Sequence, residues 1–90
     1  MTPETAEKKA IRDYLRYKGF FVYHNLAGLG VFPGIPDLTA IDDKGTVYQI
    51  EVKTPKGRQS ERQREFQDLW ESHNGIYILG GLDEVINAIK

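Results

Sequence analysis

Two short motifs in the middle of the chain carry residues of the types that act on phosphate esters. Asp37 follows a Gly-x-Pro turn, and the triplet Glu51-Val52-Lys53 begins fourteen positions later. Two carboxylates can bind a divalent cation, which neutralises charge developing at phosphorus and lowers the pKa of a bound water. Magnesium takes oxygen ligands and keeps several waters, so two carboxylates and one main-chain carbonyl are a sufficient protein contribution. A lysine beside them can orient or help to deprotonate the attacking water, or stabilise the transition state.

Two neighbouring strands are predicted to position these groups. Residues 37–41 and 46–53 read as strands, and the Asp-Asp-Lys-Gly cluster between them reads as the turn of an antiparallel hairpin. Side chains alternate between the two faces of a strand, so Gln49, Glu51 and Lys53 share one face. The intervening Tyr48, Ile50 and Val52 then face the other way. We therefore expect one face of the hairpin to be core and the other to carry the chemistry.

The rest of the chain predicts helices around a small mixed sheet. Residues 2–18 form a helix with Thr2 as its N-cap and Pro3 in its first turn, and residues 20–24 form a strand. A loop rich in glycine and proline spans 25–36. A second helix spans 60–73 and opens with Ser60-x-x-Gln63, which has the form of a capping box. Residues 76–79 read as an apolar strand, and a last helix follows it. The order is αβββαβα, an α/β fold whose last strand can run parallel to the third.

Helical periodicity assigns faces to the two longer helices. In the first helix Glu7 lies at the edge or centre of an apolar stripe, and the basic residues lie on another side. The stripe contains Ile11, Tyr14 and Leu15, and the basic side contains Lys8, Arg12 and Arg16. In the second helix we expect Phe66, Leu69 and Trp70 to point inward, and we expect Phe66, Trp70 and Tyr14 to be core.

Bulk composition limits the class of protein. The 90 residues suggest a single domain, 1–90, with 40% hydrophobic and 28% charged residues, which is typical of a globular protein. No apolar run reaches the roughly 20 residues needed to span a bilayer, and the first residues have no signal-peptide character, so we expect an intracellular, cytoplasmic protein. The chain has no cysteine. Any metal must therefore have oxygen or imidazole ligands, which favours hard cations.

The net charge of −1 argues against a protein that coats nucleic acid by bulk electrostatics. Basic residues are nevertheless concentrated between positions 53 and 64, against the single acidic Glu61. They are Lys53, Lys56, Arg58, Arg62 and Arg64. This stretch is either a solvated charged loop or a phosphate-contacting surface.

The order and spacing of these motifs resemble the PD-(D/E)xK nuclease superfamily and, within it, the VRR-NUC (virus-type replication-repair nuclease) family. The resemblance covers nearly the whole chain. It comprises an early helix with a Glu, the Gly-x-Pro-Asp turn, the Glu-x-Lys strand, a Lys-Gly loop, the Ser-x-x-Gln helix, and an apolar strand followed by a short helix.

The resemblance implies a restriction-endonuclease-like core and a set of roles. Asp37 and Glu51 would be ligands of Mg²⁺ or Mn²⁺, the carbonyl of Val52 would complete the metal shell, and Lys53 would be the catalytic lysine. Glu7 would hold the metal or its waters, and the catalytic residues would include Gln63 beside the lysine. No small-molecule cofactor is implied.

The same resemblance implies a DNA endonuclease of the DNA-repair type. Members that consist of one small domain look like dimeric Holliday-junction resolvases, so we expect cleavage of branched DNA by a homodimer, with no membrane partner. A two-fold pair suits the cutting of two strands and offsets a small core. Phage origin is suggested by the family alone. Phosphate contacts that do not read sequence would come from Lys56, Arg58, Arg62 and Arg64.

Simpler interpretations compete with each role. Asp37 could be only a turn residue, Glu51 and Lys53 could form an exposed ion pair of little energetic value, and Gln63 could be only a helix cap. The helix macrodipole also favours a Glu at position 7. His24 and Asn25 could touch substrate but are more simply packed or surface residues. For the whole chain, the alternatives are a nucleic-acid-binding module without turnover and an interaction protein that uses the Glu51-Lys53 face as a partner surface.

Overall fold

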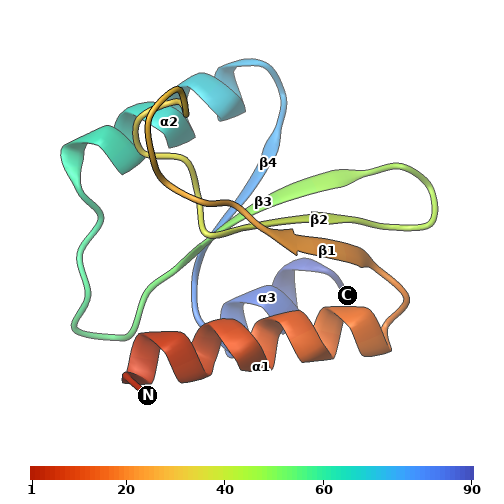
Figure 1. The fold of residues 1–90 in the computed structure, drawn as a ribbon. Coiled ribbons are helices and arrows are strands. Elements are labelled where there is room, and N and C mark those ends of the chain that lie inside the picture. The colour runs from red at the N-terminus through yellow and green to blue at the C-terminus, as the bar shows by residue number, and fades with distance from the viewer.

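The computed structural model describes all 90 residues and has the predicted αβββαβα order. Figure 1 shows the arrangement of the seven elements. In chain order they are α1 (Pro3–Tyr17), β1 (Phe21–His24), β2 (Leu38–Ile41), β3 (Val47–Val52), α2 (Glu61–Ser72), β4 (Ile76–Gly80) and α3 (Leu82–Ala88). No helix is both long and apolar enough to span a membrane.

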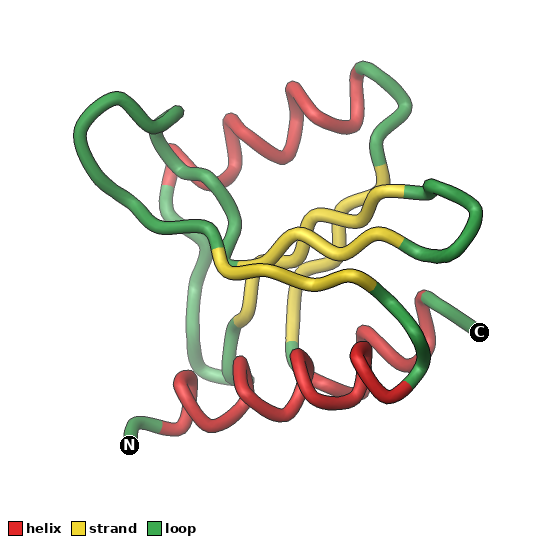
Figure 2. Tube along the Cα trace, turned by 45° about the vertical axis from the view of Figure 1, so that its right-hand side comes forward, coloured by secondary structure: helices red, strands yellow, loops and turns green.

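The four strands form one mixed sheet in the order β1-β2-β3-β4. The pairs β1–β2 and β2–β3 are antiparallel, whereas β3 and β4 are parallel. The antiparallel β2–β3 hairpin was predicted, and the parallel β3–β4 pair is the arrangement that the sequence permitted. The parallel pair requires a long crossover, and α2 provides it. Figures 1 and 2 show α2 on one side of the sheet and both α1 and α3 on the other.

The hydrophobic core lies between the sheet and the pair α1 and α3. Nine buried hydrophobic residues form it, and Tyr14 only borders it. Ile11 and Leu15 of α1 meet Ile50 and Val52 of β3, all completely buried. The other five are Val22, Leu38, Ala40, Ile78 and Val85. The apolar half of the predicted strand alternation is therefore confirmed.

The opposite face of the sheet carries polar residues that are also buried. Thr39 and Gln49 pair across β2 and β3, and Glu51 follows on the same side of β3. The amide of Asn25 donates to the hydroxyl of Thr39 at 2.9 Å, and that hydroxyl donates to Gln49 Oε1 at 3.1 Å. The helix α2 and the 25–36 loop lie over this face (Figures 1 and 2). Thr39 and Gln49 are thus enclosed and hydrogen-bonded, as most buried polar groups are.

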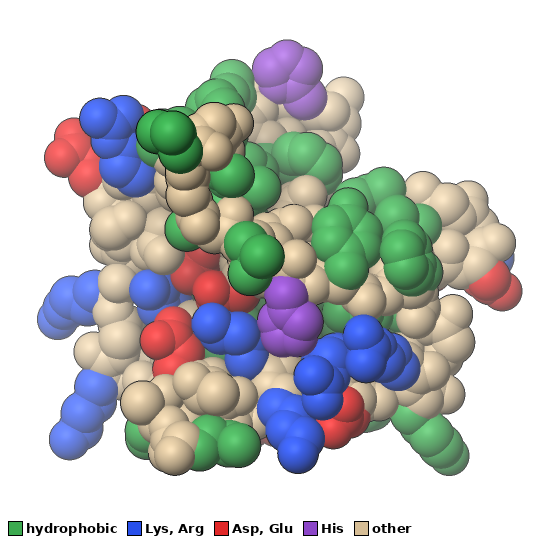
Figure 3. Space-filling model, in the orientation of Figure 1, with side chains coloured by type: hydrophobic (Ala, Val, Ile, Leu, Met, Phe, Trp, Pro, Cys, Tyr) green, Lys and Arg blue, Asp and Glu red, His purple; other side chains and the backbone are tan.

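The packing of α2 corrects one prediction. No residue of α2 is buried, and Leu69 is 49% exposed. Phe66 stacks on Trp70 with ring centroids 5.9 Å apart, and Phe32 of the loop meets Phe66 edge-on at 5.8 Å. These residues form an aromatic cluster outside the core, and apolar side chains show on the surface in Figure 3. The prediction was wrong because helical spacing shows which side is apolar but not how much sheet lies beneath it, and α2 packs mainly on the edge strand β4.

The contact between the 25–36 loop and α2 depends on Gly34. Its φ of +78° is in the left-handed region, and a side chain there would overlap the carbonyl of Arg62 in the first turn of α2. The glycine of the Gly-x-Pro-Asp motif therefore lets the loop backbone lie directly against the start of α2, just before the chain reaches Asp37.

Candidate metal centre

The β2–β3 hairpin brings Asp37 and Glu51 together. Leu38 of β2 pairs with Ile50 of β3 in the antiparallel register. The next pair of facing residues, away from the hairpin turn, is therefore Asp37 and Glu51. Residues opposite each other in such a pair have neighbouring side chains on one face. The amide of Val52 donates to Asp37 Oδ2 at 2.8 Å, which fixes the Asp37 carboxylate against β3. The predicted convergence of these two carboxylates is present in the structure.

A third carboxylate, that of Glu4, joins them from the first turn of α1. Ligand atoms of Glu4, Asp37 and Glu51 all lie within 4.8 Å of one another. Glu51 is 1% exposed, whereas Glu4 and Asp37 are partly exposed, so the cluster is open to solvent on one side. The burial of Glu51 also removes the alternatives in which this residue forms an exposed ion pair or a partner surface.

The two oxygens of Glu51 differ in their surroundings. Oε2 accepts a hydrogen bond of 2.9 Å from Gln63 Nε2 and lies 3.7 Å from Lys53 Nζ. Oε1 is buried and has no hydrogen-bond partner. An unpaired buried carboxylate oxygen is energetically costly. Burial, followed by the charges of Asp37 and Glu4, raises the pKa of Glu51 from its ordinary value of 4.5 to about 8, against the opposing effect of Lys53.

Gln63 is both a helix cap and a partner of the carboxylate cluster, whereas its catalytic role stays a prediction. Its Oε1 accepts from the backbone amide of Ser60 at 2.8 Å, which completes the capping box at the start of α2. Its Nε2 donates to Glu51 at the same time. The two roles do not compete, because they use opposite ends of the side-chain amide.

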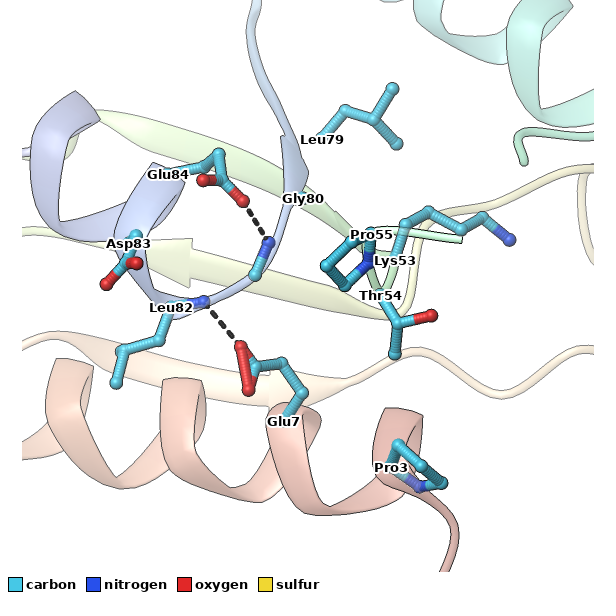
Figure 4. Close-up of a pocket in the computed structure, with 11 residues that line it drawn as sticks. Pro3, Glu7, Lys53, Thr54, Pro55, Leu79, Gly80, Leu82, Asp83 and Glu84 are labelled. Carbon is cyan, nitrogen blue, oxygen red and sulfur yellow. Dashed lines mark hydrogen bonds between the residues drawn. The ribbon is translucent and has the colours of Figure 1, made fainter. Parts of the chain in front are cut away.

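Glu7 lies away from the carboxylate cluster. Its Oε2 accepts a 2.8 Å hydrogen bond from the backbone amide of Leu82, at the start of α3. Figure 4 shows this contact in a hollow that Lys53 also borders, although the Lys53 side chain extends away from Glu7. A side chain at position 81 would approach Glu7 Oε2 to 2.5 Å, so Gly81 makes room for the carboxylate. Glu7 thus joins α1 to α3, and the structure places Glu4, one turn earlier, where Glu7 was expected.

The predicted nucleic-acid-binding residues lie on exposed parts of the crossover. Lys56 and Arg58 are exposed in the loop between β3 and α2. Arg62 and Arg64 are on α2 and form exposed ion pairs with Glu65 at 3.8 Å and Asp68 at 3.6 Å.

Comparison with known proteins identifies the fold. No protein-family model matches the chain, and no curated protein matches it significantly. A solved structure described as a VRR-NUC domain superposes on 99% of this chain and 96% of its own, with a TM-score of 0.84 and 22% identity. A second, described as a VRR-NUC domain protein, has a TM-score of 0.76 and 16% identity over 99% of this chain and 86% of its own.

The chain has the VRR-NUC fold. The predicted α/β class, the mixed sheet and the resemblance in fold are therefore confirmed.

The carboxylates that this VRR-NUC fold brings together fit a divalent cation. Magnesium ligands lie about 2.1 Å from the ion, so oxygens on opposite sides of it are about 4.2 Å apart. The three carboxylates span at most 4.8 Å, so small side-chain rotations suffice. The unpaired Oε1 of Glu51 is a free acceptor at the same place. The donor set is entirely oxygen, which suits a hard cation such as Mg²⁺ or Mn²⁺.

Two residues of the site were not identified from the sequence, although periodicity contained a signal for one. At about 100° per residue, Glu4 projects between Ile11 and Leu15, and Glu7 projects between Tyr14 and Ile11. Both carboxylates thus lie within the apolar stripe, and periodicity does not choose between them. Lys8, whose Nζ lies 3.3 Å from Asp37 Oδ1, was assigned only to the basic side of the helix.

Proposed function

We propose that this protein is a metal-dependent DNA endonuclease that hydrolyses phosphodiester bonds, acts selectively on branched DNA and works as a homodimer. The observation that carries the proposal is the buried carboxylate of Glu51, which has one oxygen without a hydrogen-bond partner and lies close to two further carboxylates and to Lys53. The fold shared with VRR-NUC domains supports a nuclease of the PD-(D/E)xK type.

In this proposal Glu4, Asp37 and Glu51 hold the cation through carboxylate oxygens. The carbonyl of Val52 is a further ligand, because the N–H and C=O of one residue in an extended strand point to the same edge, and the Val52 amide points to Asp37. When bound, Mg²⁺ or Mn²⁺ neutralises charge at the phosphate and lowers the pKa of water. Binding also requires Glu51 to give up its proton, so metal affinity should increase with pH.

Lys53 and Gln63 act beside the ligands. Lys53 Nζ lies 3.7 Å from Glu51 and its side chain is 19% exposed, so its ammonium group can reach both the carboxylate cluster and a substrate phosphate. There it would orient the attacking water or stabilise negative charge in the transition state. Gln63 is a positioning residue in this proposal, because its hydrogen bond fixes Glu51 Oε2 and leaves Oε1 for the cation.

Substrate contacts in the proposal include the exposed cations of the crossover. Lys56 and Arg58 have no carboxylate within ion-pair distance, so they are available to phosphates. Arg62 and Arg64 would exchange Glu65 and Asp68 for phosphate, at low cost because exposed ion pairs contribute little. Such contacts hold the DNA backbone without reading its sequence.

Uncovered apolar surface supports the homodimer. Phe21 and Tyr23 of the edge strand β1 are 64% and 42% exposed, and Leu29 and Phe32 of the following loop are fully and half exposed. Leu69 on α2 adds to them at 49% exposure. With only nine residues in the core, burial of this surface in a symmetric pair would add substantial hydrophobic stabilisation.

The test is cleavage and binding of four-way junction, flap, splayed and linear DNA in magnesium, manganese and chelator. Lys53→Ala and Asp37→Ala are the site variants, and Lys44→Gln in the β2–β3 turn, at the far end of the hairpin, is the control. Metal-dependent cutting of branched DNA by the wild type and the control, lost in both site variants, supports the proposal. Binding without cutting under any metal favours a nucleic-acid-binding module instead, and neither binding nor cutting excludes both functions.

A further inference from the structure

A row of basic side chains leads away from the carboxylate cluster along α1. Lys8, Arg12 and Arg16 are spaced by four residues, so they lie on successive turns, about 6 Å apart along the helix axis. This spacing is comparable to that of successive phosphates along a nucleic-acid strand. Figure 3 shows Lys and Arg side chains on both sides of a small acidic group on this face of the molecule.

The row begins at the metal centre itself. Lys8 Nζ lies 3.3 Å from Asp37 Oδ1, whereas Lys53 approaches the cluster through Glu51. Arg12 pairs with its neighbour Asp13 at 3.0 Å. Arg16 has no carboxylate within ion-pair distance, and its Nη2 makes only a long contact of 3.4 Å with the carbonyl of Val22 in β1. The charge of the row is therefore only partly neutralised, and it is least neutralised at the end distant from the carboxylates.

His24 lies close to this row. It is exposed at the end of β1, on the strand that α1 contacts. Burial lowers the pKa of His24 first, and the charges of Arg12, Lys8 and Arg16 lower it further, although Asp37 acts in the opposite direction. The three cations of the row therefore all lie close enough to His24 to disfavour its positive charge. An anion at the same point would be attracted for the same reason.

We propose that Lys8, Arg12 and Arg16, together with His24, form a second phosphate-binding track that holds the backbone of the DNA strand entering the metal centre. This proposal rests on the proposed nuclease function, because it assigns the substrate path of that site. The track lies along α1 and β1, separate from the crossover residues Lys56 to Arg64. Contacts along it are to phosphates and are independent of base sequence.

The track is tested by equilibrium binding of a four-way junction and a linear duplex in chelator, measured by fluorescence anisotropy over a range of salt concentrations. The variants are Arg12→Gln, Arg16→Gln and the double variant, and Lys44→Gln is the control of equal charge change. Lys8 is left intact because it contacts a ligand carboxylate. Arg16 is exposed and Arg12 is partly exposed, so the thermal unfolding midpoint of each variant is measured to verify folding.

Loss of one phosphate contact reduces the slope of log K against log salt by about 0.9 and weakens binding roughly 5- to 10-fold near 0.1 M salt. Each single variant should show this change and the double variant about twice the slope change, while Lys44→Gln binds as the wild type does. Arginine variants that bind with wild-type affinity and slope overturn the track and leave the nuclease proposal standing. A wild type that binds no DNA at low salt also overturns the track. If the wild type binds DNA and the arginine variants bind more weakly, but no metal-dependent cutting occurs, the track is supported and the nuclease proposal fails.

Discussion

Glu51 is buried at the end of β3 with one hydrogen-bonded oxygen and one that has no partner. A carboxyl group in this environment favours its protonated form, because burial and the neighbouring carboxylates both oppose its ionisation. The residue therefore costs stability at neutral pH unless a cation is present. Such a cost is typical of residues retained for function rather than for folding.

The pH dependence of stability should reveal this cost. Because the pKa of Glu51 is raised from 4.5 to about 8, the folded protein holds a proton between these pH values that the unfolded chain releases. The stability that Glu51 contributes through this raised pKa is fully present below pH 4.5 and is lost as the pH rises through 8. In chelator, the free energy of unfolding should fall in this interval by up to about 1.4 kcal/mol per pH unit more in the wild type than in Glu51→Gln. Equal pH slopes of the two proteins in urea unfolding would contradict this.

Glu4 and Glu7, the two α1 carboxylates considered as metal ligands, should have different functions. Glu4→Ala should weaken Mn²⁺ binding by about 10-fold or more, with little loss of stability, because Glu4 belongs to the carboxylate cluster and no side-chain hydrogen bond or ion pair ties it to another element. Glu7→Ala should leave Mn²⁺ affinity unchanged and cost about 1 to 2 kcal/mol, because it removes the hydrogen bond to the amide of Leu82. Calorimetric titration and urea unfolding measure the two effects, and the reverse pattern would restore Glu7 as the ligand.

At the scale of elements, the hairpin was predictable and the helices were less so. Alternation along β3, with the turn at residues 42–45, was enough to place Asp37 near Glu51, because a strand has only two faces and a short turn fixes the register. A helix has no such restriction. The choice between Glu4 and Glu7 depended on how far α1 extends past the end of the sheet, and local sequence does not contain that distance.

The partial burial of α2 was unpredictable for a related reason. An apolar stripe with Phe66, Leu69 and Trp70 predicts that something covers it, but it does not say what. In the structure the stripe meets an edge strand and one loop aromatic, and Leu69 remains half exposed. The roles of Gln63 were likewise left as alternatives, because a sequence motif does not show that one amide can serve two partners in different elements.

The junction of the 25–36 loop with α2 should be sensitive to a single methyl group. Gly34→Ala should cost about 2 kcal/mol or more beyond Gly30→Ala, measured by urea unfolding. Both positions have positive φ and so share the conformational penalty, but only at position 34 would the added Cβ overlap the backbone of Arg62; at position 30 it meets nothing within 4 Å. Equal costs at the two positions would show that the loop does not pack against α2.

At the scale of the whole molecule, the proposed homodimer can be tested through the uncovered apolar surface. Sedimentation equilibrium at micromolar concentration should give a dimer for the wild type and a shift toward monomer for Leu69→Asp, because a charge buried in an apolar interface is strongly unfavourable. Tyr17→Asp is the control, since Tyr17 is 87% exposed on α1, on the other side of the sheet. A wild type that stays monomeric, or a dimer that Tyr17→Asp disrupts and Leu69→Asp does not, would contradict this interface.

Single-turnover cleavage of a four-way junction tests whether Glu4, Asp37 and Glu51 form the metal centre of a nuclease. Asp37→Asn keeps the size of the side chain and its ability to accept from the Val52 amide, but removes the charge. We expect cleavage by the wild type in Mg²⁺, none in chelator, and a rate at least about 100-fold lower for a folded Asp37→Asn variant. Cleavage that persists in chelator, or an Asp37→Asn variant as fast as the wild type, would contradict this assignment.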